Sequence, residues 1–217
     1  LYGSRSDDTL TGGDGNDILI GGGGADLLVG GAGDDIYDLT DGADTIFEIG
    51  GGGFDMAFTN FAGTTTIMAN VEKLAIFGAA TGAIGSSGND TLVVGTALGA
   101  VQLDGGDGND ELRGGQWDDR LIGGSGDDAM TGNGGSDVFD FRAAGSSADV
   151  IADFDANSAG GQDLIDVSGR GFDASSIGTT IVVTNGADGF ASVAIGADTI
   201  KLLGVTTAEL TAAHFIF

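Results

Sequence analysis

The 217-residue sequence contains no cysteine and no proline, and it has a single histidine, His214. Without cysteine, disulfides, thiolate metal sites and Cys–His nucleophilic catalysis are all excluded. Basic residues are also scarce: 7 Lys and Arg stand against 33 Asp and Glu, giving a formal net charge of −26. Because phosphate contacts need Lys and Arg, this charge argues against nucleic acid and against an anionic membrane surface as partners.

The sequence also lacks a membrane-spanning segment and a recognisable signal peptide. No apolar run is long enough to cross a bilayer, and the first four residues do not resemble the start of a secretory signal peptide.

All but four of the acidic residues are Asp, whose short side chain suits turns and metal coordination. Repulsion among these carboxylates opposes a compact state unless cations neutralise them. Since 41% of the residues are hydrophobic, the composition disfavours a disordered acidic chain.

Glycine is abundant, with 44 copies, and it recurs with a nine-residue period. Three gapless units, GGDGNDILI, GGGGADLLV and GGAGDDIYD, begin at Gly12 and follow a degenerate copy at 3–11. Positions 39–47 keep the register, two residues are inserted, and 50–58 restore the pattern. The first repeat block therefore covers 1–58.

A second block covers 85–140. It opens with GSSGNDTLV and ends in four gapless units over 105–140: GGDGNDELR, GGQWDDRLI, GGSGDDAMT and GNGGSDVFD. Because Leu1 would occupy position eight of an earlier unit, we expect the repeat tract to begin further upstream.

The unit can be written G-G-x-G-x-D-x-U-x, in which U is a large apolar residue. Its first six positions predict a turn and its last three a short strand, because glycine readily adopts positive φ. Stacked strands bury the residues at position eight as a continuous ladder between two sheets. The sequence thus predicts an all-β fold, a parallel β-roll with two units per turn. The inward residues of the best-kept units are Leu19, Leu28, Tyr37, Leu112, Leu121, Met130 and Phe139.

Calcium is the cation that these loops suit. It takes six to eight oxygen ligands, which carboxylates and backbone carbonyls supply. Since loop n stacks on loop n+2, each ion would lie between two loops and take ligands from both. The predicted carboxylate pairs are Asp8 with Asp26, Asp17 with Asp35, Asp26 with Asp44, Asp35 with Asp55, Asp90 with Asp110, Asp110 with Asp128, and Asp119 with Asp137.

Backbone carbonyls of the loops are predicted to complete each calcium shell. Those of the first block belong to Gly12, Gly13, Asp14, Gly15, Gly21, Gly22, Gly23, Gly24, Gly30, Gly31, Ala32 and Gly33. Those of the second block belong to Gly105, Gly106, Asp107, Gly108, Gly114, Gly115, Gln116, Gly123, Gly124, Ser125 and Gly126.

The remaining residues divide into two parts. Residues 59–84 lose the glycine loops but retain strand-like segments at 64–68 and 71–77, which predicts further rungs of the solenoid that bind no metal. Residues 141–217 lose the period and predict a β-rich cap, because the last rung would otherwise expose its core face. We expect short strands at 150–154, 164–167, 181–184, 191–195 and 199–203, with a turn at 185–189 and one short helical turn near 207–213.

The nonapeptide resembles the calcium-binding repeat of the RTX (repeats-in-toxin), or hemolysin-type, family over 1–58 and 85–140. The segments DVIADF at 149–154 and DLIDVS at 163–168 resemble the C-terminal region of serralysin-type proteases and related exported proteins. The ending LTAAHFIF is similar to an uncleaved type I secretion signal, although His214 stands where the family often has Asp. The resemblance implies several bound Ca²⁺ ions, a secreted or cell-surface location, and the type I secretion apparatus as a partner.

The resemblance leaves some residues open. It implies a non-repeat calcium site at Asp149, Asp153 and Asp163, for which ordinary turn and strand-edge acids are an equal alternative. Trp117 and Asn133 occupy glycine positions, and the loops of 3–11 and 39–47 lack several glycines, so we expect weaker or no binding there. Trp117 suits local packing better than sugar stacking.

Three functions remain for comparison. The first is a module that stays unfolded in the low-calcium cytosol and folds with Ca²⁺ after type I secretion. The second is a structural module of a surface layer or adhesin, in which calcium also bridges self-associated copies. The third places an enzyme upstream, since this sequence has no H-E-x-x-H and no G-x-S-x-G motif, and identically repeated carboxylates do not single out a catalytic site.

Overall fold

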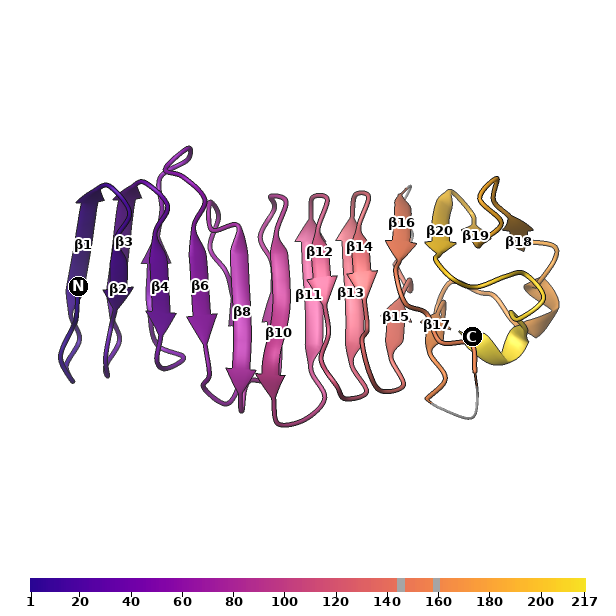
Figure 1. The fold of residues 1–217 in the computed structure, drawn as a ribbon, viewed down its shortest axis with the longest axis horizontal. Coiled ribbons are helices and arrows are strands. Elements are labelled where there is room, and N and C mark those ends of the chain that lie inside the picture. The colour runs from indigo at the N-terminus through magenta and orange to yellow at the C-terminus, as the bar shows by residue number, and fades with distance from the viewer. Residues whose placement is uncertain (144–146, 158–160) are drawn as a thin grey trace.

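The computed structural model describes residues 1–143, 147–157 and 161–217 as an elongated solenoid of β-strands (Figure 1). Its strands are short: some contain only the three residues after a turn, and others, such as Leu27–Ala32, run on into the first three positions of the next unit. Their bounds are β1 Thr9–Asp14, β2 Ile18–Ile20, β3 Leu27–Ala32, β4 Ile36–Leu39, β5 Thr45–Phe47, β6 Met56–Thr59, β7 Thr64–Thr66, β8 Lys73–Gly78, β9 Gly82–Ile84, β10 Thr91–Ala97, β11 Gln102–Asp107, β12 Glu111–Arg113, β13 Arg120–Ser125, β14 Ala129–Thr131, β15 Val138–Asp140, β16 Ala148–Ile151, β17 Leu164–Asp166, β18 Ile181–Asn185, β19 Ala191–Ile195, β20 Asp198–Leu202 and β21 Phe215–Ile216.

Even-numbered and odd-numbered strands lie on opposite walls of the roll. In the described residues, the even wall is one sheet in the order β2-β4-β6-β8-β10-β12-β14-β16-β20, extended by β19 and β18. The odd wall consists of two sheets, β1-β3-β5 and β7-β9-β11-β13-β15-β17-β21. From β1 to β17, each strand pairs in parallel with the next but one, except β5 with β7, so two units make one turn. The predicted parallel β-roll is confirmed.

The register stacks equivalent repeat positions. Leu19 pairs with Tyr37 in the even wall, and Leu10 pairs with Leu28 in the odd wall. All seven side chains predicted to form the core ladder are at most 1% exposed. Short strands bury little apolar surface alone, and this continuous ladder gives the roll its core.

The stretch between the blocks forms rungs, as its sequence predicts. It contributes β7, β8 and β9, and the even wall passes through it without a break. The odd wall is interrupted, because β5 and β7 belong to different sheets. A groove between them is lined by residues that include Asp44, Ile46, Phe61 and Thr65. The break between β5 and β7 is thus confined to the odd wall. That residues 59–84 form a separate, metal-free segment remains a prediction.

The C-terminal residues close both walls. β20 joins the even wall beside β16, β21 joins the odd wall beside β17, and β18 and β19 form a hairpin across the predicted turn. Arg170 fastens this part to the roll: its guanidinium forms a buried ion pair with Asp198 at 2.7 Å and donates to the carbonyls of Phe141 and Ile195.

Helical structure in 1–143, 147–157 and 161–217 is limited to two single 3₁₀ turns, η1 Ala174–Ser176 and η2 Ala212–His214. The second overlaps the helical turn expected near 207–213. Neither of these turns approaches the length that crossing a membrane requires. His214 is buried there, with Nε2 3.0 Å from the carbonyl oxygen of Ala156 and its ring against Phe154.

Candidate metal centre

The acid at position six of each unit directly precedes a strand, so parallel stacking places these acids in two columns. Because the strands of the two walls run in opposite directions, the two columns lie along opposite edges of the roll (Figure 1). The even column, before the even strands, contains Asp17, Asp35, Asp55, Glu72, Asp90, Asp110, Asp128 and, one residue inside β16, Asp149. The odd column contains Asp8, Asp26 and Asp44, then Asp119, Asp137 and Asp163. Before β7, β9 and β11 the odd column has Gly63, Thr81 and Val101 instead.

The structure brings together all seven predicted carboxylate pairs. In each pair the backbone N–H of the first aspartate donates to Oδ1 of the second. The distance is 2.8 Å in six pairs and 3.2 Å between Asp26 and Asp44. In each pair, one carboxylate oxygen thus forms a hydrogen bond that links two successive turns of the roll.

The other oxygen, Oδ2, lacks a partner in many loops. Six loop aspartates have a buried Oδ2 that accepts no hydrogen bond from any described residue: Asp17, Asp26, Asp35, Asp44, Asp110 and Asp128. A buried, uncompensated carboxylate oxygen is costly, and pairing with a cation removes that cost. These atoms therefore fit the oxygen ligands of a hard cation.

Glycine at position one makes room for this oxygen. A Cβ placed on Gly12 would lie 2.5 Å from Oδ2 of Asp17, and one on Gly114 would lie 2.8 Å from Oδ2 of Asp119. The same overlap occurs at Gly21, Gly105, Gly123 and Gly132 with the aspartate of each loop. Any larger residue would fill the space into which Oδ2 points.

The carbonyl-bearing loop residues are stacked as well. Asp14 pairs with Ala32, and Asp107 pairs with Ser125, each at the third position of its unit. Gly31 has φ of +114°, and a Cβ there would overlap the carbonyl oxygen of Gly13. Loop glycines such as Gly13 and Gly31 thus form tightly stacked turns, and the role of the loop carbonyls as calcium ligands stays a prediction.

Burial and mutual repulsion act on the carboxylates when cations are absent. Burial, reinforced by neighbouring carboxylates, raises the pKa of Asp128 and Asp137 to about 7, against a backbone hydrogen bond that lowers it. The same causes raise the pKa of Asp110 and Asp163 to about 6. The loops therefore hold carboxylates whose charge is unfavourable without a compensating cation.

Three acids of the C-terminal region do not form one cluster. Asp149 extends the even column, where Oδ1 accepts from the N–H of Asp128 at 2.9 Å. Asp163 extends the odd column and accepts from the N–H of Asp137 at 2.8 Å. Asp153 accepts from the N–H groups of Gly132 and Asn133 at the last repeat loop. The structure thus separates Asp149 from the other two.

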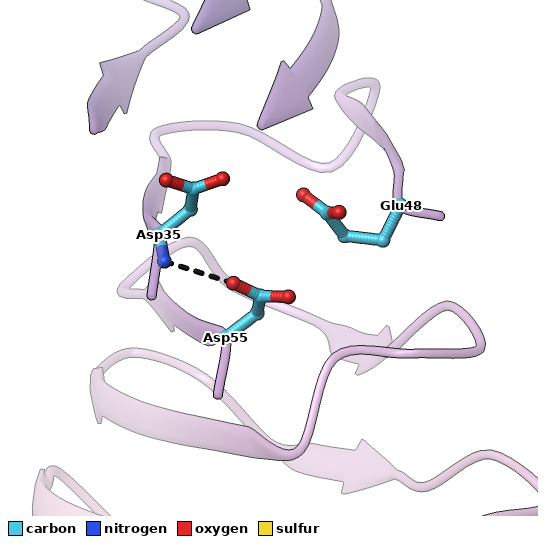
Figure 2. Close-up of side chains that lie close together, drawn as sticks. All are labelled: Asp35, Glu48 and Asp55. Atoms are coloured by element: carbon cyan, nitrogen blue, oxygen red, sulfur yellow. Dashed lines mark hydrogen bonds between the residues drawn. The ribbon is translucent and has the colours of Figure 1, made fainter. Parts of the chain in front are cut away.

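Sequence reasoning missed two acids of the site. Glu72 takes the position of a loop aspartate, since Oε2 accepts from the N–H of Asp55 at 2.7 Å. Its place directly before a strand is the signal that identifies it. Glu48 belongs to the two-residue insertion after 39–47, and it lies beside Asp35 and Asp55 (Figure 2). No repeat position predicts this contact.

Trp117 and Asn133, the two residues that replace glycine, adapt differently. Trp117 remains half exposed, and its Nε1 donates to the carbonyl of Ala97 at 3.2 Å. Asn133 adopts φ of +70°, and its Nδ2 donates to the carbonyl of Gly114 at 2.8 Å. Asparagine tolerates this left-handed conformation better than other residues with a Cβ.

Replacing Asn133 tests that account. Asn133→Ala is expected to lower the free energy of unfolding by about 1–3 kcal/mol, because it keeps the left-handed strain and loses the side-chain hydrogen bond. Asn133→Gly relieves the strain, so its net change should stay below about 1 kcal/mol. Urea unfolding in saturating calcium measures both, and equal losses in the two variants would contradict the prediction.

Comparison with known proteins agrees with the repeat pattern. Residues 1–28, 15–46 and 104–139 match the RTX calcium-binding nonapeptide repeat family, in 4 copies. No curated protein sequence matches the chain. Among solved structures, it is similar to the extracellular lipase LipA from Serratia marcescens, with 20% sequence identity and a TM-score of 0.48. That alignment covers 100% of this chain and 39% of the lipase, so the chain spans well under half of the lipase's length.

Proposed function

We propose that this chain, which contains RTX calcium-binding nonapeptide repeats, is a module of an exported protein whose folding depends on Ca²⁺. The observation that supports this most directly is the set of buried Oδ2 atoms without a partner among the described residues. They repeat along both columns, and all but that of Asp44 lie beside a glycine whose missing side chain leaves space. A hard divalent cation supplies the missing interaction with oxygen ligands.

The energetics of the ion-free chain support the same proposal. The loops bury acidic groups at closely spaced intervals in a molecule of net charge −26, which disfavours the compact state. Only the folded chain brings each pair together. A cation that binds this state and not the unfolded one stabilises folding by mass action.

Export would make use of this dependence. Calcium is scarce in the cytosol, so the chain would stay unfolded until it leaves the cell by type I secretion. Extracellular calcium modules bind with dissociation constants of about 10⁻⁴–10⁻³ M. The predicted cap, 141–217, would then close the last rung of the roll. Any catalytic activity of the parent protein would lie upstream of residue 1.

A calcium titration followed by far-ultraviolet circular dichroism tests the proposal. In excess chelator near neutral pH, the β-sheet signal is expected to be largely absent, and it should appear cooperatively as Ca²⁺ is added. Magnesium at the same concentration should be a poor substitute, since it demands near-octahedral geometry and dehydrates reluctantly. A chain fully folded in excess chelator would refute calcium-dependent folding, and a chain that binds no calcium would refute the calcium function as well.

A further inference from the structure

One loop of the even column has an additional carboxylate beside its pair of aspartates. Glu48 enters through the two-residue insertion between β5 and β6, the region where a loop projects beyond its neighbours (Figure 1). Within the described residues, Asp35, Glu48 and Asp55 are the one group of three acids with ligand atoms all within 4.8 Å of one another. All three residues are buried, with exposed fractions of 0%, 6% and 1%.

The three carboxylates face a common space (Figure 2). Oδ1 of Asp55 is occupied, because it accepts from the backbone N–H of Asp35 at 2.8 Å. Glu48 is held from two sides: Tyr37 donates its hydroxyl to Oε1, and the N–H of Ile49 donates to Oε2 at 3.1 Å. The glutamate is thus fixed in place by the core ladder and by its own loop.

A second observation indicates a ligand in this space. Oδ2 of Asp35 is fully buried and has no hydrogen-bond partner in the described part of the chain. A Cβ built on Gly30 would overlap Asp35 Oδ2, Glu48 Oε1 and Tyr37 Oη together. The unpartnered oxygen is therefore directed at the same point as the glutamate, and Gly30 keeps that point clear.

We propose that Asp35, Glu48 and Asp55 form a three-carboxylate site that binds Ca²⁺ more tightly than the ordinary repeat loops. Those loops place two carboxylates around each position, whereas this site provides three negative charges. Calcium affinity rises with the number of charged ligands and with the rigidity of the site. The site is both more charged and more firmly held, so it fills at the lowest calcium concentration.

This inference rests on the proposed calcium function, and its test separates the two. The probe is Tb³⁺ as a calcium substitute, added to the full chain with Trp117→Phe and Tyr2→Phe, so that Tyr37 is the remaining sensitiser of terbium emission. Its hydroxyl contacts Glu48, so terbium bound at this site should give the strongest sensitised emission. Competition by Ca²⁺ then gives the affinity of the site for calcium.

Glu48→Gln is expected to weaken binding at this site about tenfold or more, because it removes one charged ligand and preserves the acceptor for Tyr37. Glu111→Gln is the matched control, since Glu111 is an exposed partner of Arg113 in β12. It should leave the terbium signal unchanged. Asp128→Asn should remove only the weaker calcium binding at its own loop and leave the tight class intact. If Glu48→Gln does not fold, Glu48→Asp keeps the charge and should recover part of the affinity.

The outcomes distinguish the two proposals. Calcium binding of one uniform affinity, unchanged in Glu48→Gln, would overturn the three-carboxylate site and leave the calcium function standing. Greater stability of Glu48→Gln in chelator, with unaltered calcium affinity, would identify Glu48 as a proton-sharing acid and also overturn it. Absence of Ca²⁺ and Tb³⁺ binding in every variant would refute the calcium function itself.

Discussion

Acidification is expected to replace calcium as the agent that folds this chain. In excess chelator, the β-sheet signal should be weak at about pH 8 and rise strongly as the pH falls to about 5. The cause is the set of buried loop carboxylates. Asp128 and Asp137 have a pKa of about 7, and Asp110 and Asp163 of about 6, against an ordinary value of 3.8.

The sign follows from proton linkage. Between 3.8 and these raised pKa values the folded chain binds more protons than the unfolded chain, so the free energy of unfolding increases as the pH falls. The gain is complete near the unfolded pKa and is lost as the pH rises through the folded values. At still lower pH, the stability depends on Asp140 instead. Burial alone would raise the pKa of Asp140, but hydrogen bonds from Arg142 and Arg120 outweigh burial and hold that pKa below its ordinary value. Protonating Asp140 removes those contacts, so stability should fall again in strong acid.

Circular dichroism and light scattering measure this effect together, which separates folding from association. The variant with Asp110, Asp128 and Asp137 replaced by Asn is the control, because it lacks three of the charges at any pH. It should be more folded than the parent in chelator at about pH 8, and its response to acid should be smaller. A parent chain that loses β-sheet signal between about pH 8 and about pH 5 would contradict the prediction.

Phe139→Ala is expected to lower the free energy of unfolding by about 3–5 kcal/mol, the usual cost of truncating a buried phenylalanine. Phe139 is fully buried in β15, where it stacks between Leu121 and Ile165. Its ring also lies 6.0 Å from that of Phe154, which belongs to the C-terminal region. The cavity would thus open at the junction between the last repeat and the cap.

Phe47→Ala is the matched control in another strand. Phe47 ends β5 and is 56% exposed, so its truncation should change the free energy of unfolding by less than about 0.5 kcal/mol. Both variants are compared by urea unfolding in saturating calcium. Similar losses in the two would show that the ladder at position eight does not carry the stability of the roll.

The nine-residue period predicts most of the fold. Strict spacing fixes which residue of each unit faces inward, and parallel stacking of equal units then fixes the register. The buried ladder from Leu19 to Phe139 and the seven paired aspartates follow from these two constraints. Alternation and turn residues also predict the strands of the C-terminal region, except β21, which was not predicted. Function beyond the repeats remains a proposal.

Other features depend on contacts that no period encodes. Glu48 reaches Asp35 only because an insertion bends the chain back toward the even column, and the path of an insertion is not given by the repeat. Glu72 was overlooked because its rung lacks the glycines that mark a loop. The odd wall is interrupted because β5 and β7 do not pair with each other. Whether two such strands pair depends on the length of the intervening loops and on the size of the local side chains, which the repeat does not encode.

The interruption of the odd wall also has a mechanical consequence. A solenoid with a hydrogen-bonded sheet on each side resists bending toward either side. Between β5 and β7, however, only the even wall has strands that are hydrogen-bonded to one another across the gap. The even wall is continuous there through β4, β6 and β8. The rod is therefore most compliant at this point, and bending opens the groove beside Asp44 while the spacing along the even column stays nearly constant.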